Sequence, residues 1–257
     1  MAFPNYRNKH AKKALFSAHD YWAYLRKRGK GATFRPPSGI ILCYQRSLLK
    51  HILETHRTTE TVMYHRGLHL LDETGGQIGV MGSFGIGAPA AVTVLEELIA
   101  MGVRNFISVG SAGTLQIGIK IGDLIVCDKA IRDEGTSHHY LKPAKYAHAS
   151  ATMTAKITRA LDALNHKYRI GTSWTIDAPY RETVAEVRQY QKQGIATVEM
   201  EAAALFAVAQ YRKVDMGAIF SVSDSLAELE WKPKFHSKST SKGLESIYSA
   251  ALTALQS

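Results

Sequence analysis

The chain has 257 residues, of which 46% are hydrophobic and 21% charged, and a formal net charge of +10. This length suits one large domain or two small ones. No run of 18 apolar residues occurs, which argues against a membrane-spanning helix. Cys43 and Cys127 lie in apolar segments without metal-ligand spacing, so we expect a reduced, cytoplasmic protein with neither a disulfide framework nor a zinc site.

The excess positive charge lies at one end of the chain. Residues 1–50 hold eleven Lys or Arg and one acid, Asp20, whereas acids and bases balance over the rest. Such a segment suits contact with nucleic acid, an anionic surface or a phosphate-bearing ligand, or it is a targeting peptide. A secretory signal is excluded because no apolar stretch follows the basic one. We interpret the chain as a single domain, 1–257, with a basic N-terminal extension at about 1–38.

Short apolar segments alternate with longer helical patterns from about residue 38 onward. In chain order, these patterns predict a strand at 39–44, a strand at 78–84, a helix at 90–101, a strand at 105–110, a strand at 121–128, a helix at 151–165, a strand at 170–176, a helix at 181–193, a strand at 195–199, a helix at 200–212, a strand at 216–223 and a helix from about 241. This alternation indicates an α/β sandwich with a mostly parallel or mixed sheet. Ligands of such sheets bind beyond the carboxyl ends of the strands.

Two glycine-rich segments follow predicted strands. Gly85-Ile86-Gly87 opens a predicted helix, where backbone N–H groups can receive an anion. Gly110-Ser111-Ala112-Gly113 can present a hydroxyl and amides to a phosphate or to an anomeric carbon. Neither segment matches a nucleotide-binding loop or a serine-hydrolase elbow, and a turn that needs glycine for its conformation explains each as well.

Two acidic segments follow later strands. Glu199-Met200-Glu201 stands where a buried strand becomes an apolar helix, a place where a purely structural sequence seldom has two carboxylates. A helix dipole explains one of them, and a buried glutamate suits the vicinal hydroxyls of a ribose. Asp224 follows the strand at 216–223, where it is either a helix N-cap or a general acid whose pKa burial raises.

Taken in order, these four strand ends resemble the nucleoside phosphorylase family, which includes hexameric purine nucleoside phosphorylases, uridine phosphorylases and methylthioadenosine nucleosidases. The matching stretches are SFGIGAPAAVTVLEELIAMGVRNFISVGSAGTLQIGIKIGDLIVCD, WTIDAPYRET and GIATVEMEAAALFAVAQYRKVDMGAIFSVSDSL, within roughly residues 40–230. The resemblance implies a three-layer α/β/α sandwich with a central mixed sheet. It also implies a pentosyltransferase that cleaves a nucleoside with phosphate into free base and ribose 1-phosphate.

The resemblance implies roles for individual residues. Glu201 looks like the glutamate that binds the ribose hydroxyls, with Met200 packing on the sugar and Glu199 beside it. Asp224 looks like the aspartate that protonates N7 of a leaving purine, which favours purine nucleosides. The phosphate-binding positions correspond to Arg46, Arg66 and Ser111, and the base-pocket segment to Tyr180 and Arg181.

The implied partners are a nucleoside and inorganic phosphate, and no metal or organic cofactor is expected. The His138-His139 pair has no third ligand at helical or hairpin spacing. In this family the arginine at the position of Arg66 typically reaches across a dimer interface, so we expect a homo-oligomer, either a dimer or a trimer of dimers. We expect neither a membrane nor a nucleic acid as a partner.

Several positions depart from the family pattern. Ser108 stands where a third phosphate-binding arginine is usual, and residues 42–45 (LCYQ) replace a Gly-Asp-Pro loop. Pro179 stands where an aromatic residue commonly stacks on the base. The arginine that assists the purine acid has no clear counterpart, and its candidate substitutes are Lys232, Lys234 and His236.

Three alternatives therefore stay open. They are a uridine phosphorylase, a nucleosidase that uses water in place of phosphate, and a non-catalytic protein that binds nucleosides or nucleic acid. The loss of one phosphate ligand favours hydrolysis. Nucleosidases of this family, however, activate water with a glutamate near the first strand, and residues 1–50 contain only Asp20. Two retained arginines and this missing base favour phosphorolysis.

Overall fold

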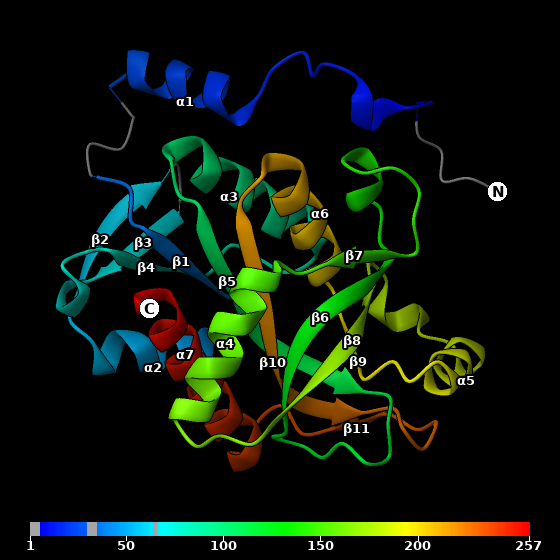
Figure 1. Cartoon of the computed structure of the whole chain (residues 1–257). Coiled ribbons are helices and arrows are strands. Elements are labelled where there is room, and N and C mark those ends of the chain that lie inside the picture. Colours follow the sequence, from blue (N-terminus) through cyan, green and yellow to red (C-terminus); the bar gives the residue numbers. More distant parts are fainter. Residues whose placement is uncertain (1–5, 30–34, 64–65) are drawn as a thin grey trace.

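The computed structural model describes residues 6–29, 35–63 and 66–257. Its strands form one mixed sheet with helices on both sides (Figure 1). The strands are β1 (Gly39–Cys43), β2 (Thr58–Met63), β3 (Arg66–Leu71), β4 (Ile78–Met81), β5 (Asn105–Thr114), β6 (Leu124–Asp133), β7 (Tyr146–His148), β8 (Tyr168–Ile176), β9 (Thr197–Glu199), β10 (Asp215–Ser225) and β11 (Lys232–Pro233). The helices are α1 (Ala18–Lys27), α2 (Arg46–Thr55), α3 (Ala88–Met101), α4 (Ala151–Ala163), α5 (Val184–Lys192), α6 (Ala202–Arg212) and α7 (Lys238–Gln256).

Part of the sheet closes on itself. Strand β5 is parallel to β1 and β10, β10 is antiparallel to β6, β6 is parallel to β8, and β8 is parallel to β9. Strand β9 then pairs antiparallel with the end of β5, which completes a ring of five strands. The closure brings the carboxyl ends of β5, β9 and β10 together.

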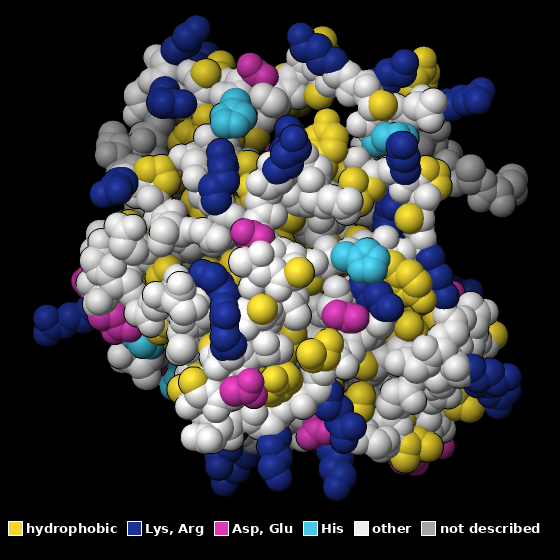
Figure 2. Space-filling view, in the orientation of Figure 1, with side chains coloured by type: hydrophobic (Ala, Val, Ile, Leu, Met, Phe, Trp, Pro, Cys, Tyr) yellow, Lys and Arg dark blue, Asp and Glu magenta, His cyan; other side chains and the backbone are white. Residues whose placement is uncertain are grey.

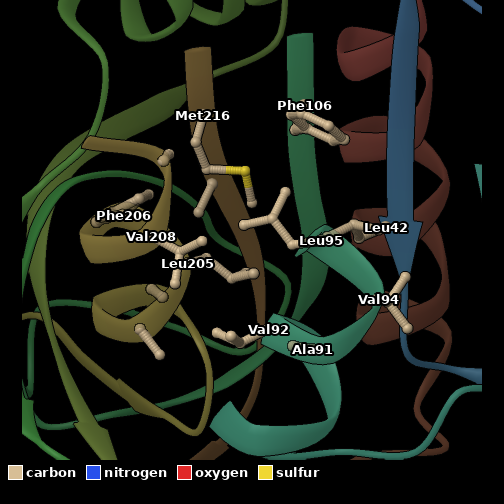
Figure 3. Close-up of a cluster of buried hydrophobic side chains, with 14 of the residues drawn as sticks. Leu42, Ala91, Val92, Val94, Leu95, Phe106, Leu205, Phe206, Val208 and Met216 are labelled. Atoms are coloured by element: carbon tan, nitrogen blue, oxygen red, sulfur yellow. The ribbon is translucent and has the colours of Figure 1, made fainter. Parts of the chain in front are cut away.

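Two hydrophobic layers cover the sheet, as expected for a three-layer sandwich. Along β1, Ile40 and Leu42 face the layer of α3 and α6, whereas Ile41 and Cys43 face the layer of α2, α4 and α7. Figure 3 shows the first layer, where Val92 and Leu95 of α3 lie among Leu205, Phe106 and Met216. Because both faces are covered, β1 and β4 are buried at every position and lack an alternating pattern.

The N-terminal segment packs against the body of the protein. Trp22 of α1 is only 4% exposed, and its Nε1 donates to the backbone oxygen of Glu97 in α3 at 3.1 Å. Helix α1 begins with a capping box between Ser17 and Asp20. In Figure 2 many Lys and Arg side chains cover this upper part of the molecule. No helix within the described ranges is both long and apolar enough to span a membrane.

Most predicted elements are confirmed, with three corrections. Residues 110–114 are not a turn, because β5 continues through them and pairs with β10 on one side and β9 on the other. Asp224 is not a helix N-cap, since it lies within β10 opposite Gly113. The segments 18–27 and 46–55 form α1 and α2, and the segments 58–63 and 66–71 form the antiparallel strands β2 and β3, none of which the sequence patterns predicted.

Candidate active site

Residues from four strands meet around the end of β5. Val109 of β5 lies beside Cys43 at the end of β1, and Gly113 lies between Val198 of β9 and Asp224 of β10. Three acidic side chains are buried here, although buried carboxylates are rare in proteins. These are Glu199, Glu201 and Asp224. The sheet closure therefore brings together acids that are distant in the sequence.

Glu199 has its carboxylate oxygens occupied by protein donors. Its Oε2 accepts from the backbone N–H groups of Glu201 and Ala202 at 2.8 and 2.7 Å. Its Oε1 accepts from the hydroxyls of Ser173 and Thr175 at 3.2 and 2.5 Å. The carboxylate thus holds the first turn of α6, whose free N–H groups favour a negative charge. This arrangement suits support of Glu201 better than direct contact with a ribose.

Glu201 reaches across to the start of α3. Its Oε1 accepts from the backbone N–H of Gly87 at 2.6 Å. Gly87 has φ of 91°, a left-handed conformation that glycine adopts readily and that other residues adopt only with strain. Met200 lies next to this contact, since a Cβ on Gly87 would stand 4.0 Å from its Cε. Glu201 and Met200 thus both lie against the backbone of the glycine loop at Gly87.

The two glutamates are electrostatically coupled. Burial, followed by the charge of Glu199, raises the pKa of Glu201 to about 8, and the N–H of Gly87 opposes this rise. Burial also raises the pKa of Glu199, but its four donors stabilise the ionised form. The charge of Glu199 therefore favours the protonated form of Glu201.

Asp224 is held by two side chains. Its Oδ1 accepts from the hydroxyl of Ser223 at 2.8 Å, and its Oδ2 accepts from Nε1 of Trp231 at 3.1 Å. Burial raises the pKa of Asp224, and both hydrogen bonds oppose the rise. The close approach of β5 needs Gly113, because a Cβ there would stand 3.0 Å from Oδ2 of Asp224. A buried carboxyl with a raised pKa suits a general acid.

Glu182 adds a further carboxyl that the sequence did not single out. It follows the short helix η4 (Pro179–Arg181) and is half-buried. Burial, followed by the charges of Asp224 and Glu186, raises the pKa of Glu182 to about 7. The acidic surroundings of Asp224 thus include a residue from the segment that leads into α5.

A polar group joins the ends of β1 and β5. Nε2 of Gln45 donates to Oγ of Ser111 at 3.0 Å. The phenol of Tyr44 shares a hydrogen bond of 3.1 Å with the buried Ser108, and its ring meets that of Phe84 edge-on at 5.2 Å. Burial, followed by the charge of Glu201, raises the pKa of Tyr44 well above its ordinary value, so the phenol is neutral. Ser108 is therefore an internal group, and Ser111 is the hydroxyl at the strand end.

The sequence also matches a known protein family. The family model of the phosphorylase superfamily matches residues 47–255. The chain belongs to the phosphorylase superfamily. The matched range includes every predicted site residue except Arg46, and it leaves out the N-terminal segment that carries α1. The predicted membership of the nucleoside phosphorylase family is confirmed.

Individual members of the superfamily are similar in sequence and fold. Uridine phosphorylase of Thermococcus kodakarensis is 35% identical over 54% of this chain and 55% of its own length. Guanosine phosphorylase of Halorubrum lacusprofundi is 32% identical over 56% of this chain and 60% of its own length. This chain thus spans little more than half the length of these two curated relatives. The crystal structure of uridine phosphorylase from Vibrio fischeri ES114 superposes with a TM-score of 0.72 and 28% identity, covering 87% of this chain and 92% of that one. The predicted fold class is confirmed.

The predicted phosphate ligands are only partly gathered in this phosphorylase-superfamily site. Ser111 lies at its centre, and Arg46 follows Gln45 at the first turn of α2, with an exposed side chain. Arg66 begins β3, and its side chain lies outside the described part of the structure. Both arginines therefore stay predictions, while Gln45 is a site residue that the sequence did not single out.

The predicted base-binding residues have exposed side chains. Tyr180 is 100% exposed and Arg181 is exposed as well, both on η4. Their assignment to the base therefore stays a prediction. Trp231, which the sequence did not single out either, donates a hydrogen bond to the carboxyl of Asp224. Its only sequence signal is a tryptophan in an otherwise polar turn.

No group that could bind a metal is found in the described ranges, where no three His, Cys, Asp or Glu side chains gather closely enough. Nε2 of His138 lies 3.1 Å from the backbone oxygen of Arg132, and Nδ1 of His139 lies 2.8 Å from Nζ of Lys9. The contacts of the histidine pair are thus with backbone and with the N-terminal segment.

Proposed function

We propose that this chain is a nucleoside phosphorylase that transfers a ribosyl group from a nucleoside to inorganic phosphate. The observation that carries the proposal is that Ser111 and Asp224 lie on the paired ends of β5 and β10, and that Glu201 directly follows β9, which pairs with the end of β5. Glu201 can accept hydrogen bonds from the sugar hydroxyls, Asp224 can donate a proton, and Ser111 can donate a hydrogen bond to an anion. Membership of the phosphorylase superfamily supports the same activity.

The sugar is assigned to Glu201. Two vicinal hydroxyls can donate to one carboxylate, and a carboxylate near an oxocarbenium-like sugar stabilises the positive charge of the transition state. Glu199 holds the backbone of this residue through the N–H of Glu201 at 2.8 Å. Met200 offers an apolar surface beside the glycine loop. In this proposal Glu199 acts on the sugar through Glu201.

The leaving base is assigned to Asp224. When a phosphate oxygen bonds to C1′, the electrons of the N-glycosidic bond move onto the base, which leaves more readily if it takes up a proton. Asp224 is buried, and burial raises its pKa, which favours the protonated form that can donate. A purine accepts this proton at N7, and we therefore favour purine nucleosides as the substrates.

Phosphate is assigned to the region of Ser111 and Arg46, with Arg66 as a further ligand. The hydroxyl of Ser111 lies at the strand end, and Gln45 directs its amide toward it. Arginine suits phosphate because its planar guanidinium donates two parallel hydrogen bonds. Arg66 would come from a neighbouring subunit, in a dimer or a trimer of dimers, and sedimentation analysis tests that assembly.

Phosphate is favoured over water as the acceptor. A hydrolase needs a base to activate water, and residues 1–50 contain only one acid, Asp20. Asp20 is exposed, and its carboxylate accepts from the backbone N–H and hydroxyl of Ser17 at the start of α1. It is therefore engaged in capping a helix.

Uridine is the second candidate substrate. Uridine phosphorylases stand among the relatives beside a guanosine phosphorylase, so the family alone does not select the base. We place the reaction in the cytoplasm and expect no cofactor besides phosphate. The free, buried state of Cys43 and Cys127 is consistent with a reducing compartment.

The experiment that tests the assignment of Asp224 compares Asp224→Asn with wild type on two purine nucleosides. On inosine, we expect kcat to fall about 10²- to 10⁴-fold, while KM changes little. On 7-methylguanosine, whose base is already positively charged, we expect most of the turnover to remain. The exposed Asp162 of α4 provides the control variant Asp162→Asn, which should match wild type. Equal losses on both nucleosides would remove Asp224 from proton donation.

A further inference from the structure

Trp231 lies over Asp224 because the chain reverses after β10. Strand β11 pairs antiparallel with the end of β10, with Pro233 opposite Asp224 and Lys232 opposite Ser225. This short hairpin returns the indole to the buried carboxyl, where Nε1 donates to Oδ2 at 3.1 Å. The pairing therefore fixes a side chain seven residues further along the chain against the proton donor.

Hydrophobic burial does not explain the position of this tryptophan. Trp231 is 63% exposed, and its ring lies 6.2 Å from that of Phe235, which is 44% exposed. A large aromatic side chain at the surface gains little from apolar contact, so its one polar group accounts for its orientation. That group is an N–H, which donates hydrogen bonds and accepts none.

The charged side chains of the same hairpin do not replace the tryptophan. Nζ of Lys232 forms an ion pair with Glu228, and the side chains of Lys234 and His236 are exposed. The charge of Asp224 contributes to the raised pKa of Glu182, a carboxyl in the segment that leads into α5. Among the residues that the structure describes, the side-chain hydrogen bonds to the Asp224 carboxyl therefore come from two neutral donors, Ser223 and Trp231.

We propose that Trp231 is a positioning residue that holds Oδ2 of Asp224, so that the carboxyl donates its proton to the leaving base while remaining free of a cationic partner. This inference rests on the proposed phosphorylase activity. A neutral donor fixes the carboxyl in both protonation states, because the oxygens of an acid and of a carboxylate both accept. A cation would fix it as well, but would favour the ionised form, which cannot donate.

Two substitutions separate orientation from charge. Trp231→Phe keeps the aromatic ring and removes the N–H, so the ionised form of Asp224 loses a donor and its pKa rises. Trp231→Arg supplies a donor that carries a charge, so the pKa of Asp224 falls. Lys242→Ala changes an exposed charge on α7 and serves as the control. Because Trp231 is exposed, we expect the melting temperatures of all three variants to stay close to wild type.

The experiment measures phosphorolysis from pH 5.5 to 9.5 with each variant. We expect the basic limb of the kcat profile to move to higher pH in Trp231→Phe and to lower pH in Trp231→Arg, by about one pH unit in the latter. We also expect kcat of Trp231→Phe to fall about tenfold at its optimum, with KM for phosphate unchanged. Profiles that stay with wild type, or that both move in the same direction, would overturn the proposal.

A second readout does not require activity. The fluorescence of wild type minus that of Trp231→Phe isolates the signal of Trp231 from those of Trp22 and Trp174, which are buried. We expect this difference to change with pH as Asp224 titrates and to lose that change in Asp224→Asn. A wild type that cleaves no nucleoside would refute the phosphorylase function alone, whereas an unchanged titration in Asp224→Asn would refute the positioning role.

Discussion

Raising the pH from 7 to 9 should strengthen nucleoside binding about tenfold. The reason lies in Glu201, which is assigned to the ribose hydroxyls and whose pKa is raised to about 8. Hydroxyls donate to a carboxylate, and a protonated carboxyl accepts them less well. The protein must therefore release a proton from Glu201 before or while it binds the sugar.

The size of the change in affinity follows from the difference between the pH and the pKa of Glu201. With a pKa of about 8, about one Glu201 in ten is ionised at pH 7, and about nine in ten are ionised at pH 9. The need to deprotonate Glu201 at pH 7 therefore weakens the apparent affinity about tenfold. Binding at pH 7 should also release close to one proton per nucleoside, about 0.9.

Isothermal titration calorimetry measures both quantities without turnover if phosphate is left out. The nucleoside should have no ionisation of its own between pH 6.5 and 9, a condition that adenosine meets. Titrations at pH 7 in two buffers with different ionisation enthalpies give the number of protons released. Glu201→Gln keeps the hydrogen bond to Gly87 through its amide oxygen and removes the ionisation, so it is the matched control.

Two results would refute this reasoning. A wild-type affinity that stays constant from pH 7 to 9, with no proton released, would show that the sugar does not require the ionised Glu201. A Glu201→Gln variant that binds as tightly as wild type at pH 9 would show that this carboxylate does not hold the ribose.

Three further substitutions test the structure that surrounds the site. Glu199→Ala should lower the free energy of unfolding by about 3 kcal/mol or more in urea denaturation, because four donors lose their acceptor; a cost near zero would contradict its supporting role. Gly87→Ala should cost about 1 to 2 kcal/mol, since its φ of 91° strains any side chain, and should weaken nucleoside binding; equal melting temperatures would argue against that strain. Trp22→Ala should cost about 3 kcal/mol and expose the basic segment to trypsin; a wild-type digestion pattern would show that α1 stays docked without this anchor.

The sequence predicted the sheet and its active edge because buried strands have continuous apolar runs. Residues 39–43, for example, are buried on both faces, and no polar position interrupts them. The hairpin at 58–71 was missed because its threonines and glutamate resemble a polar loop. Helix α2 carried an apolar stripe at Leu48, Leu49 and Ile52 that could have been recognised.

Contacts between distant strands explain most of the remaining differences. Residues 110–114 contain two glycines and resemble a turn, yet pairing with β9 and β10 keeps them extended. Glu199 and Glu201 look equivalent in the sequence, and only the donors from Ser173 and Thr175 separate a supporting carboxylate from an available one. Local patterns carry no information about such partners.

The roles of Gln45, Glu182 and Trp231 depend on the same kind of contact. Gln45 stands in a segment that departs from the family pattern, and Trp231 lies outside every predicted element, whereas Glu182 lies in the predicted helix at 181–193. Each was passed over in the sequence. The hairpin of β10 and β11 decides that the donor to Asp224 is Trp231 and none of the basic residues beside it.

The measurement that tests the central claim most directly is the product formed from the sugar. The full chain is incubated with a panel of purine and pyrimidine nucleosides, with and without inorganic phosphate, and the sugar product is identified by mass spectrometry. We predict ribose 1-phosphate and free base with phosphate present, fastest with a purine nucleoside, and no cleavage without phosphate. Free ribose formed at the same rate with or without phosphate, or no cleavage of any nucleoside, would contradict the proposed phosphorylase activity.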